Sequence, residues 1–240
     1  MSGEKNPRNK NSSEYLQIAI DGTVAAGKGT VSRLIAERLG LLYVDTGAMY
    51  RCTALLILLN NLNDKDEDEI IEELAKHTIE LRMPTEEEKD GRLVTVLLDG
   101  EDVSWKIRTQ EVSTLSSVIA QHPKVRAELV RLQKEMAENN DVIMEGRDIT
   151  HTVLPDAQIK IYLDADPVTR AKRRLSELIG KGVDITLLAI LEELKERDER
   201  DMIMNLKKVP GVWEIDTTNL SISEVVELIT EKADQIASDF

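Results

Sequence analysis

The stretch that decides the fold is Gly22-Thr23-Val24-Ala25-Ala26-Gly27-Lys28-Gly29-Thr30. The apolar residues 18–20 precede it and predict a short buried strand, and the periodic residues 31–39 after it predict a helix. A glycine-rich loop that joins a strand to a helix and ends in lysine wraps backbone N–H groups around phosphate oxygens. We therefore predict a phosphate-binding loop in which Lys28 supplies a mobile positive charge.

A glycine-rich turn with a solvated lysine is the alternative interpretation, but the strand and helix that the motif requires are both predicted. The residue after Lys28 is Gly29, so the hydroxyl that usually binds magnesium in such loops is displaced to Thr30. Gly-Lys-Gly-Thr resembles the loop of nucleoside monophosphate kinases more than that of GTPases. We expect Mg²⁺ to rest mainly on nucleotide oxygens and water, and the sequence assigns no direct protein ligand to it.

The composition of the 240-residue chain is acidic. Asp and Glu total 45 against 31 Lys and Arg, which gives a net charge of −14. This balance argues against nucleic-acid binding, which needs a basic surface. It also means that any phosphate site must be a local cluster of arginines and lysines. The single cysteine, Cys52, excludes a disulfide within the chain, fits a reducing compartment and is interpreted as core packing.

No apolar stretch approaches membrane-spanning length, and the polar start lacks the apolar centre of a signal sequence. We therefore expect a cytoplasmic protein with no membrane partner. Residues 1–14 are predicted to be a disordered polar tail, and residues 15–240 a single, monomeric domain.

Strands alternate with helices along the chain, which predicts a mainly parallel sheet with right-handed crossovers. The sheet strands are expected near residues 16–21, 41–44, 142–145, 159–163 and 213–216. Residues 78–83 and 92–98 predict a small antiparallel insert. Ligands of parallel sheets bind beyond the carboxyl ends of the strands, which here are followed by polar residues such as Asp45, Asp148 and Asp164.

Arginines recur near these strand ends and on two later helices: Arg51, Arg147, Arg170, Arg173, Arg174, Arg197 and Arg200. Taken singly, each has an ordinary explanation, namely a surface residue after a helix cap, a turn with an internal ion pair, or a solvated helix face. Their number in an acidic chain that also carries a phosphate loop favours a shared anion-binding pocket.

Several motifs together resemble the bacterial cytidylate kinases. Besides the loop, they are Asp45-Thr46-Gly47-Ala48-Met49-Tyr50-Arg51, residues 99–104, 107–109, 146–148 and 155–157, and residues 196–201. The resemblance runs from about residue 18 to the C-terminus and implies a P-loop nucleoside monophosphate kinase fold of about five core strands. It implies a core of residues 15–59, 121–169 and 206–240, a monophosphate-binding insert (60–120) and a short helical lid (170–205).

The resemblance also implies transfer of the γ-phosphoryl group of ATP, with Mg²⁺, to CMP or dCMP in pyrimidine nucleotide metabolism. It implies that ATP is bound by the nine loop residues from Gly22 to Thr30. The residues it would place in catalysis are Lys28, Arg147, Arg170, Arg174 and Arg197. The residues it would place around CMP are Asp45, Thr46, Tyr50, Arg51, Ser117, Arg126, Arg147, Asp148, Arg197 and Asp201.

The chain departs from the family pattern at three places. Ala25 stands where the loop usually has glycine, and Thr150 with His151 replaces a Gly-Thr pair. Met204 stands where the family usually has an arginine near the monophosphate. This removes one phosphate contact, for which Arg200, Lys207 and Lys208 are the candidate substitutes.

Other functions fit parts of the same pattern. A kinase for UMP, AMP or a non-nucleotide alcohol, a non-catalytic ATP-binding sensor and a plain ATPase would all need the phosphate loop. A sensor would be free to lose Lys28 and the lid arginines, which this chain retains. A carboxylate such as Asp148 accepts from the cytosine amine and repels the uracil carbonyl, which favours CMP as the acceptor.

Overall fold

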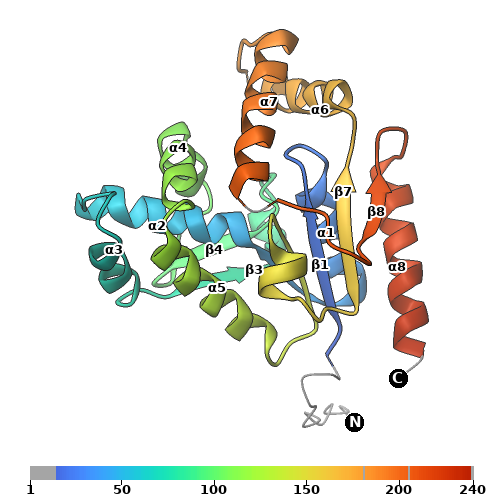
Figure 1. Ribbon diagram of the computed structural model, residues 1–240, viewed down its shortest axis with the longest axis horizontal. Coiled ribbons are helices and arrows are strands. Elements are labelled where there is room, and N and C mark those ends of the chain that lie inside the picture. The colour runs from blue at the N-terminus through green and yellow to red at the C-terminus, as the bar shows by residue number, and fades with distance from the viewer. Residues whose placement is uncertain (1–14, 181, 205, 239–240) are drawn as a thin grey trace.

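The computed structural model describes residues 15–180, 182–204 and 206–238, so the predicted tail at residues 1–14 lies outside the described residues. A five-stranded parallel sheet forms the centre (Figure 1). Its strands, in spatial order, are β2 (Leu42–Asp45), β6 (Val142–Gly146), β1 (Gln17–Gly22), β7 (Ile159–Asp164) and β8 (Trp213–Asp216). This confirms the mainly parallel sheet that the alternating pattern predicts.

Helices cover both faces of the sheet, which is why β1 is a continuous apolar run with Ile18, Ala19 and Ile20 all inaccessible to solvent. The helices are α1 (Lys28–Leu39), α2 (Thr46–Asn60), α3 (Glu67–Leu74), α4 (Gln110–Ile119), α5 (Pro123–Ala137), α6 (Pro167–Gly180), α7 (Leu187–Met204) and α8 (Ile222–Ser238). Helices α1 and α8 pack together, and α2 to α5 lie on the side of the sheet away from α8 (Figure 1). Cys52 is buried in the core, as predicted.

Two local signals set the ends of α1. Gly27 adopts φ 96° immediately before the helix, and Gly40 ends it at φ 69°, both in the left-handed region that favours glycine. Helix α2 is capped instead by Asp45, the residue before its first turn, whose carboxylate accepts the N–H of Ala48 at 3.0 Å. Helix α2 therefore starts directly at the carboxyl end of β2, whereas the phosphate loop separates α1 from the carboxyl end of β1.

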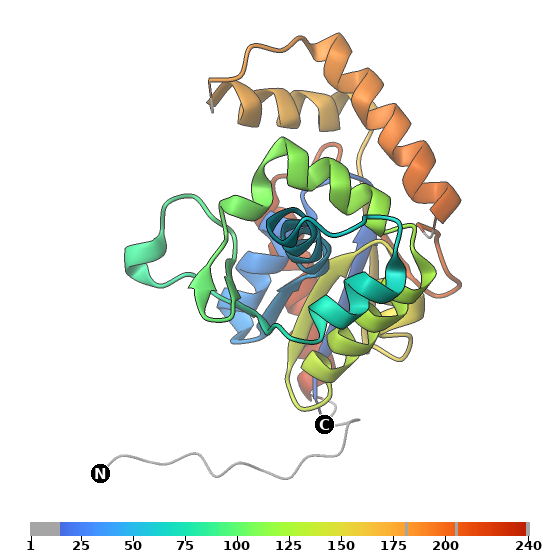
Figure 2. The same cartoon turned by 90° about the vertical axis from the view of Figure 1, so that its left-hand side faces the viewer.

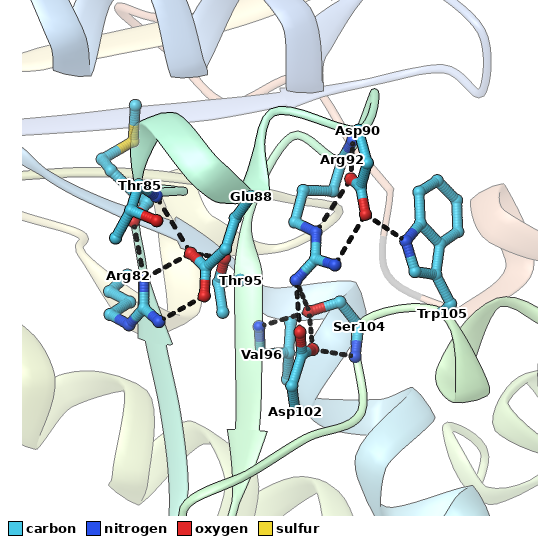
Figure 3. Close-up of polar contacts among 11 residues, drawn as sticks. Arg82, Thr85, Glu88, Asp90, Arg92, Thr95, Val96, Asp102, Ser104 and Trp105 are labelled. Carbon is cyan, nitrogen blue, oxygen red and sulfur yellow. Dashed lines mark hydrogen bonds and ion pairs between the residues drawn. The ribbon is translucent and has the colours of Figure 1, made fainter.

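The antiparallel insert is also present, as β3 (Ile79–Arg82), β4 (Thr95–Leu98) and β5 (Glu101–Asp102). Strand β4 is shorter than predicted, because Arg92 leaves the strand to bridge Asp90 and Asp102 (Figure 3). Strand β5 was not predicted, because its two residues follow directly on the turn at Asp99 and Gly100.

The helices α6 and α7 stand over the carboxyl edge of the sheet (Figures 1 and 2). They have a small core of their own, formed by Ala171, Ile190 and Leu194 and packed against Val24 and Ala25 of the phosphate loop. No helix within the described ranges is both long and apolar enough to span a bilayer. Besides the loop, the pair contacts the rest of the molecule through Arg173, which donates to Thr217 Oγ1 and O at 3.0 and 2.6 Å, and through Asp201, which accepts from Arg147 at 2.6 Å.

A π-helical turn at Ile149–Val153 follows β6 and was not predicted. Asp21 fixes this turn by accepting the backbone N–H groups of Ile149 and Thr150. Long-range hydrogen bonds of this kind leave no periodic signal in the local sequence.

Candidate active site

A cavity of about 430 Å³ lies at the carboxyl edge of the sheet, below α6 and α7. One end is formed by the phosphate loop, and we call it the loop end; it includes Val24, Ala25, Gly27, Lys28, Gly29 and Thr30. The other end, which we call the acceptor end, is formed by α2, α4, α5 and the turn after β6. It includes Asp45, Thr46, Tyr50, Arg51, Ser117, Arg126, Arg147 and Asp148.

Lys28 is buried at the loop end, with 6% of its surface exposed. Its Nζ donates to the carbonyl oxygens of Gly22 and Thr23 at 2.9 and 2.8 Å. Burial, reinforced by the nearby Arg147, lowers the pKa of Lys28 to about 7. An anion in the cavity would favour the charged form of this lysine.

Glycine is required by space at one loop position and leaves little room for a side chain at another. A Cβ on Gly22 would lie 1.9 Å from the carbonyl oxygen of Leu163 in the adjacent strand β7. A Cβ on Gly29 would lie 2.9 Å from Glu145 Oε1 and 3.1 Å from Leu93 Cδ1. A side chain at position 29 would therefore require Glu145 and Leu93 to shift.

Ala25 has φ 59°, the left-handed conformation that L-residues other than glycine adopt at a cost of about 1 kcal/mol. Alanine at position 25, where the family usually has glycine, is thus a strained residue of the loop. Three of the nine loop residues, Gly22, Thr23 and Ala26, do not line this cavity. Thr23 instead donates its hydroxyl to Asp164 at 2.6 Å, which ties the loop to β7.

Arginines at the acceptor end are paired with carboxylates. Arg51 Nη2 lies 2.8 Å from Asp45 Oδ2, and Arg147 Nε donates to Asp201 Oδ2 at 2.6 Å. Burial alone would raise the pKa of Asp45, but Arg51 and Arg108 hold it below its usual value. The Asp45 carboxylate therefore stays ionised and keeps Arg51 in place.

A second group at the acceptor end combines donors and acceptors. Arg126 forms an ion pair with the buried Asp148, and the Ser117 hydroxyl donates to Ser113 O at 3.2 Å. Burial raises the pKa of Tyr50 to about 12, so its phenol stays protonated at neutral pH. These groups offer a planar, hydrogen-bonding ligand both donors and a carboxylate.

The arginines of α6 and α7 are not all in the cavity. Arg174 and Arg197 line it, and burial beside Arg147 lowers the pKa of Arg197. Arg170 does not line it: its side chain is ion-paired with Asp198 at 2.6 Å and donates to Val24 O at 3.1 Å. The structure therefore brings together four of the five residues predicted to be catalytic, and places Arg170 at a neighbouring cavity.

Sequence reasoning gave no role to Arg108 or Glu145, which both line the cavity. Arg108 Nη2 is buried without a hydrogen-bond partner in the described part of the chain, 3.8 Å from Asp45 Oδ2. Glu145 accepts the hydroxyl of Tyr43 at 2.7 Å. Burial raises the pKa of Glu145, and the negative charge of the nearby Asp45 raises it further. Arg108 lies within a quoted motif and Glu145 ends a core strand, so both had a usable signal.

Of the three candidates to replace the arginine absent at position 204, Arg200 lines the cavity, whereas Lys207 and Lys208 do not. Lys208 lies 5.0 Å from the ring centre of Tyr162 and pairs with Glu214. The side chain of Met204 lies outside the part that the structure describes.

A glycine-rich loop that cradles a buried lysine at the edge of a parallel sheet, opposite a cluster of arginines, defines a P-loop kinase. Comparison with known proteins narrows this class to one family. The family model described as "Cytidylate kinase" matches residues 18–235, and the chain belongs to that family.

Three curated relatives illustrate the similarity, and each is named cytidylate kinase. The protein of Caldicellulosiruptor bescii is 44% identical over 219 residues, covering 90% of this chain and 94% of the relative. The Bacillus subtilis protein is 43% identical over 223 residues, covering 92% and 97%. A Geobacillus protein is 45% identical over 219 residues, covering 90% and 95%. The matches span nearly the whole of each protein.

Proposed function

We propose that this protein transfers the γ-phosphoryl group of ATP to CMP or dCMP, giving ADP and CDP or dCDP, and so serves pyrimidine nucleotide metabolism in the cytoplasm. The observation that carries the proposal is that the phosphate loop and the arginine-rich acceptor end line one cavity. Membership of the cytidylate kinase family supports the choice of substrate.

The chemistry asks the protein to position groups and to stabilise charge. The phosphate of CMP is already anionic at neutral pH, so its oxygen attacks the γ-phosphorus without a general base while the bond to the β-γ bridging oxygen breaks. Lys28 and the loop N–H groups hold the outer phosphates of ATP. Arg51 and Arg147 hold the phosphate of CMP, and Arg174 and Arg197 offset charge on the group being transferred.

The donor set at the loop end suits Mg²⁺, a hard ion that prefers oxygen ligands and keeps several waters. The hydroxyl of Thr30 and the carboxylate of Glu145 both line the cavity there. Bound with ATP, the ion would neutralise phosphate charge. Thr30 and Glu145 are the residues that would face it or its waters.

Recognition of the base is assigned to Ser117, Arg126 and Asp148. Cytosine has an amine where uracil has a carbonyl, and the Asp148 carboxylate accepts from the first and repels the second. Arg126 holds that carboxylate in place through their ion pair. Asp201 and Arg197 contact the sugar from α7.

We also propose the division of the domain into an insert (60–120) and a lid (170–205) as working parts of a monomer. Closure of the lid would exclude water, which otherwise competes with CMP for the γ-phosphoryl group. Gly182, at φ 77°, lies between α6 and α7 and, with Gly180, is a candidate hinge. In the structure as it stands, Arg170 bonds to Val24 of the loop and so connects the lid to it.

A coupled assay for ADP release tests the proposal. With ATP and Mg²⁺ present, release should depend on CMP or dCMP, and UMP and AMP should be poor acceptors. Release without any acceptor would indicate an ATPase, a better rate with UMP or AMP would indicate a different monophosphate kinase, and ATP binding without release would indicate a sensor.

A further inference from the structure

The carboxylate of Asp21 is a fully buried charged group that the proposed mechanism does not use. Asp21 lies in β1 immediately before the phosphate loop, with no surface exposed. Oδ1 accepts the N–H of Ile149 at 2.8 Å, and Oδ2 accepts the N–H and the hydroxyl of Thr150 at 2.9 and 2.6 Å. All three donors belong to the π-helical turn that directly follows Arg147 and Asp148.

The position of that turn decides where two acceptor-end side chains lie. The pairing of β1 with β6 ends at Asp21 and Gly146. Beyond Gly146 the chain leaves the sheet, and its hydrogen bonds back to β1 are made by the Asp21 carboxylate. Arg147 and Asp148 are therefore held between the end of a strand pairing and an anchored turn.

The balance of interactions at Asp21 is also informative. Burial raises the pKa of Asp21, and the hydrogen bonds from Thr150 and Ile149 oppose that rise only in part. His151 Nδ1 lies 4.0 Å from Asp21 Oδ2, but burial lowers the pKa of this histidine and so favours its neutral form. The Asp21 carboxylate is desolvated, and its three hydrogen bonds within the described residues all come from one turn, which is consistent with a positional role.

Thr150 contributes an interaction that a glycine at this position would not provide. It stands where the resemblance places glycine, and a glycine would provide the backbone N–H but no hydroxyl. The Thr150 side chain is buried, and its hydroxyl makes the shortest of the three bonds to Asp21. The bond can be removed or restored here without touching any residue that lines the cavity.

We propose that Asp21 is a positioning residue that couples the start of the phosphate loop to the acceptor end, and that the Thr150 hydroxyl reinforces the coupling. The inference rests on the proposed function. By fixing the turn after Asp148, Asp21 sets the direction of Arg147 toward the phosphate of CMP and of Asp148 toward the base. The coupling holds the phosphate loop, which follows β1, and the acceptor-end residues after β6 in a fixed position relative to each other.

The experiment compares Thr150→Val, which removes the hydroxyl, with Thr150→Ser, which keeps it. KM is measured for CMP and for ATP, along with the CMP-over-UMP preference. Loss of one hydrogen bond should raise KM for CMP by roughly two- to tenfold and narrow that preference, with KM for ATP changed by less than about twofold. Thr150→Ser should restore both values. Asp21→Asn, which removes a charge and offers an amide N–H to backbone donors, should have a larger effect in the same direction.

Thr230→Val is the matched control, because Thr230 is equally buried and its hydroxyl donates to Val226 O at 2.9 Å in the distant helix α8. It should alter the melting temperature and leave both KM values unchanged. Equal KM values for CMP in the Thr150→Val and Thr150→Ser proteins, or parallel changes in both KM values, would overturn the positioning role. Failure of the proposed function would show differently, as no CMP-dependent release of ADP by the unmodified protein.

Discussion

The two ends of the cavity hold their positive charges in different ways. At the acceptor end, arginines are paired with carboxylates, as in Arg51 with Asp45 and Arg147 with Asp201. At the loop end, Lys28 Nζ donates to two carbonyl oxygens of its own loop. One end thus has fixed ion pairs, and the other has a cation whose proton is weakly held.

The difference follows from the chemistry of the side chains. A guanidinium stays charged in any protein environment and has donors to spare, so a carboxylate can fix its orientation and still leave N–H groups for a phosphate. An ammonium loses its proton when it is desolvated. A chain with a net charge of −14 can therefore use its many carboxylates to orient arginines at the acceptor end. At the loop end, the phosphates of a bound nucleotide would favour the charged form of Lys28, whose pKa is lowered to about 7.

The largest effect is expected from removing the cation at the loop end. Lys28→Met keeps the length of the side chain but not its charge, and kcat should fall by about 10²- to 10³-fold or more, because one stabilising donor to the transferred group is lost. Binding of CMP, measured by calorimetry, should be unchanged. A Lys28→Met protein with near-normal turnover would show that the arginines suffice, and the contrast between the two ends would then have no functional meaning.

A change in base preference is the next largest effect and tests the acceptor end alone. Asp148→Asn removes a charged acceptor for the cytosine amine, so the ratio of kcat/KM for CMP over UMP should fall by roughly tenfold or more. Asp198→Asn is the control, since Asp198 pairs with Arg170 outside the main cavity. An unaltered ratio in the Asp148→Asn protein would remove Asp148 from base recognition.

How much the sequence could predict differs between parts of the molecule. The sheet and the loop were predictable because apolar runs and the Gly–Lys motif are local signals, and β8 was predicted at its observed residues, 213–216. The π-helical turn after β6 was not, because it is fixed by Asp21, more than a hundred residues away. The location of Arg170 outside the main cavity was not predictable either, because it depends on an ion pair with Asp198 that joins α6 to α7.

The motifs identified most of the residues that line the cavity, but not their partners. Arg126 and Asp148 were both singled out, yet their mutual ion pair depends on how α5 packs beside the turn after β6. Arg108 belongs to the motif at residues 107–109, but that motif alone assigns it no role. Its importance appears only when Asp45 is seen beside it.

Arg108 is paired more loosely than Arg51, because its Nη2 lies 3.8 Å from Asp45 Oδ2 whereas that of Arg51 lies at 2.8 Å, and it tests how much a close ion pair matters at the acceptor end. Its Nη2 is buried near Asp45 but makes no hydrogen bond within the described residues. Arg108→Ala should therefore raise KM for CMP by about tenfold, the value of a hydrogen bond to a charged group. Arg200→Ala, at an exposed cavity residue, should raise it less. If Arg200→Ala raised KM for CMP more than Arg108→Ala did, Arg200 would be the substitute for the arginine missing at position 204.

The smallest effect concerns the proton on Lys28, and it tests the loop end directly. Burial holds the pKa of Lys28 near 7, against 10.5 for an ordinary lysine, so at pH 8 most of the nucleotide-free protein should have a neutral Lys28. The phosphates of ATP raise the pKa again, so binding of Mg²⁺-ATP at pH 8 should take up a proton, approaching one per site. Calorimetry in buffers of different ionisation enthalpy measures this uptake, and Lys28→Met should abolish it.

The lowered pKa of Lys28 also determines whether the folded protein becomes more or less stable as the pH rises. Between pH 7 and 10.5 the unfolded chain binds more protons at this lysine than the folded one, so the Lys28 contribution makes the nucleotide-free protein more stable as the pH rises through that window. The difference in unfolding free energy between the unmodified and the Lys28→Met proteins, followed from pH 7 to 9, isolates this contribution. A difference that does not change with pH, together with no proton uptake on binding, would mean that Lys28 is charged before the nucleotide arrives and that both ends of the cavity carry fixed charges.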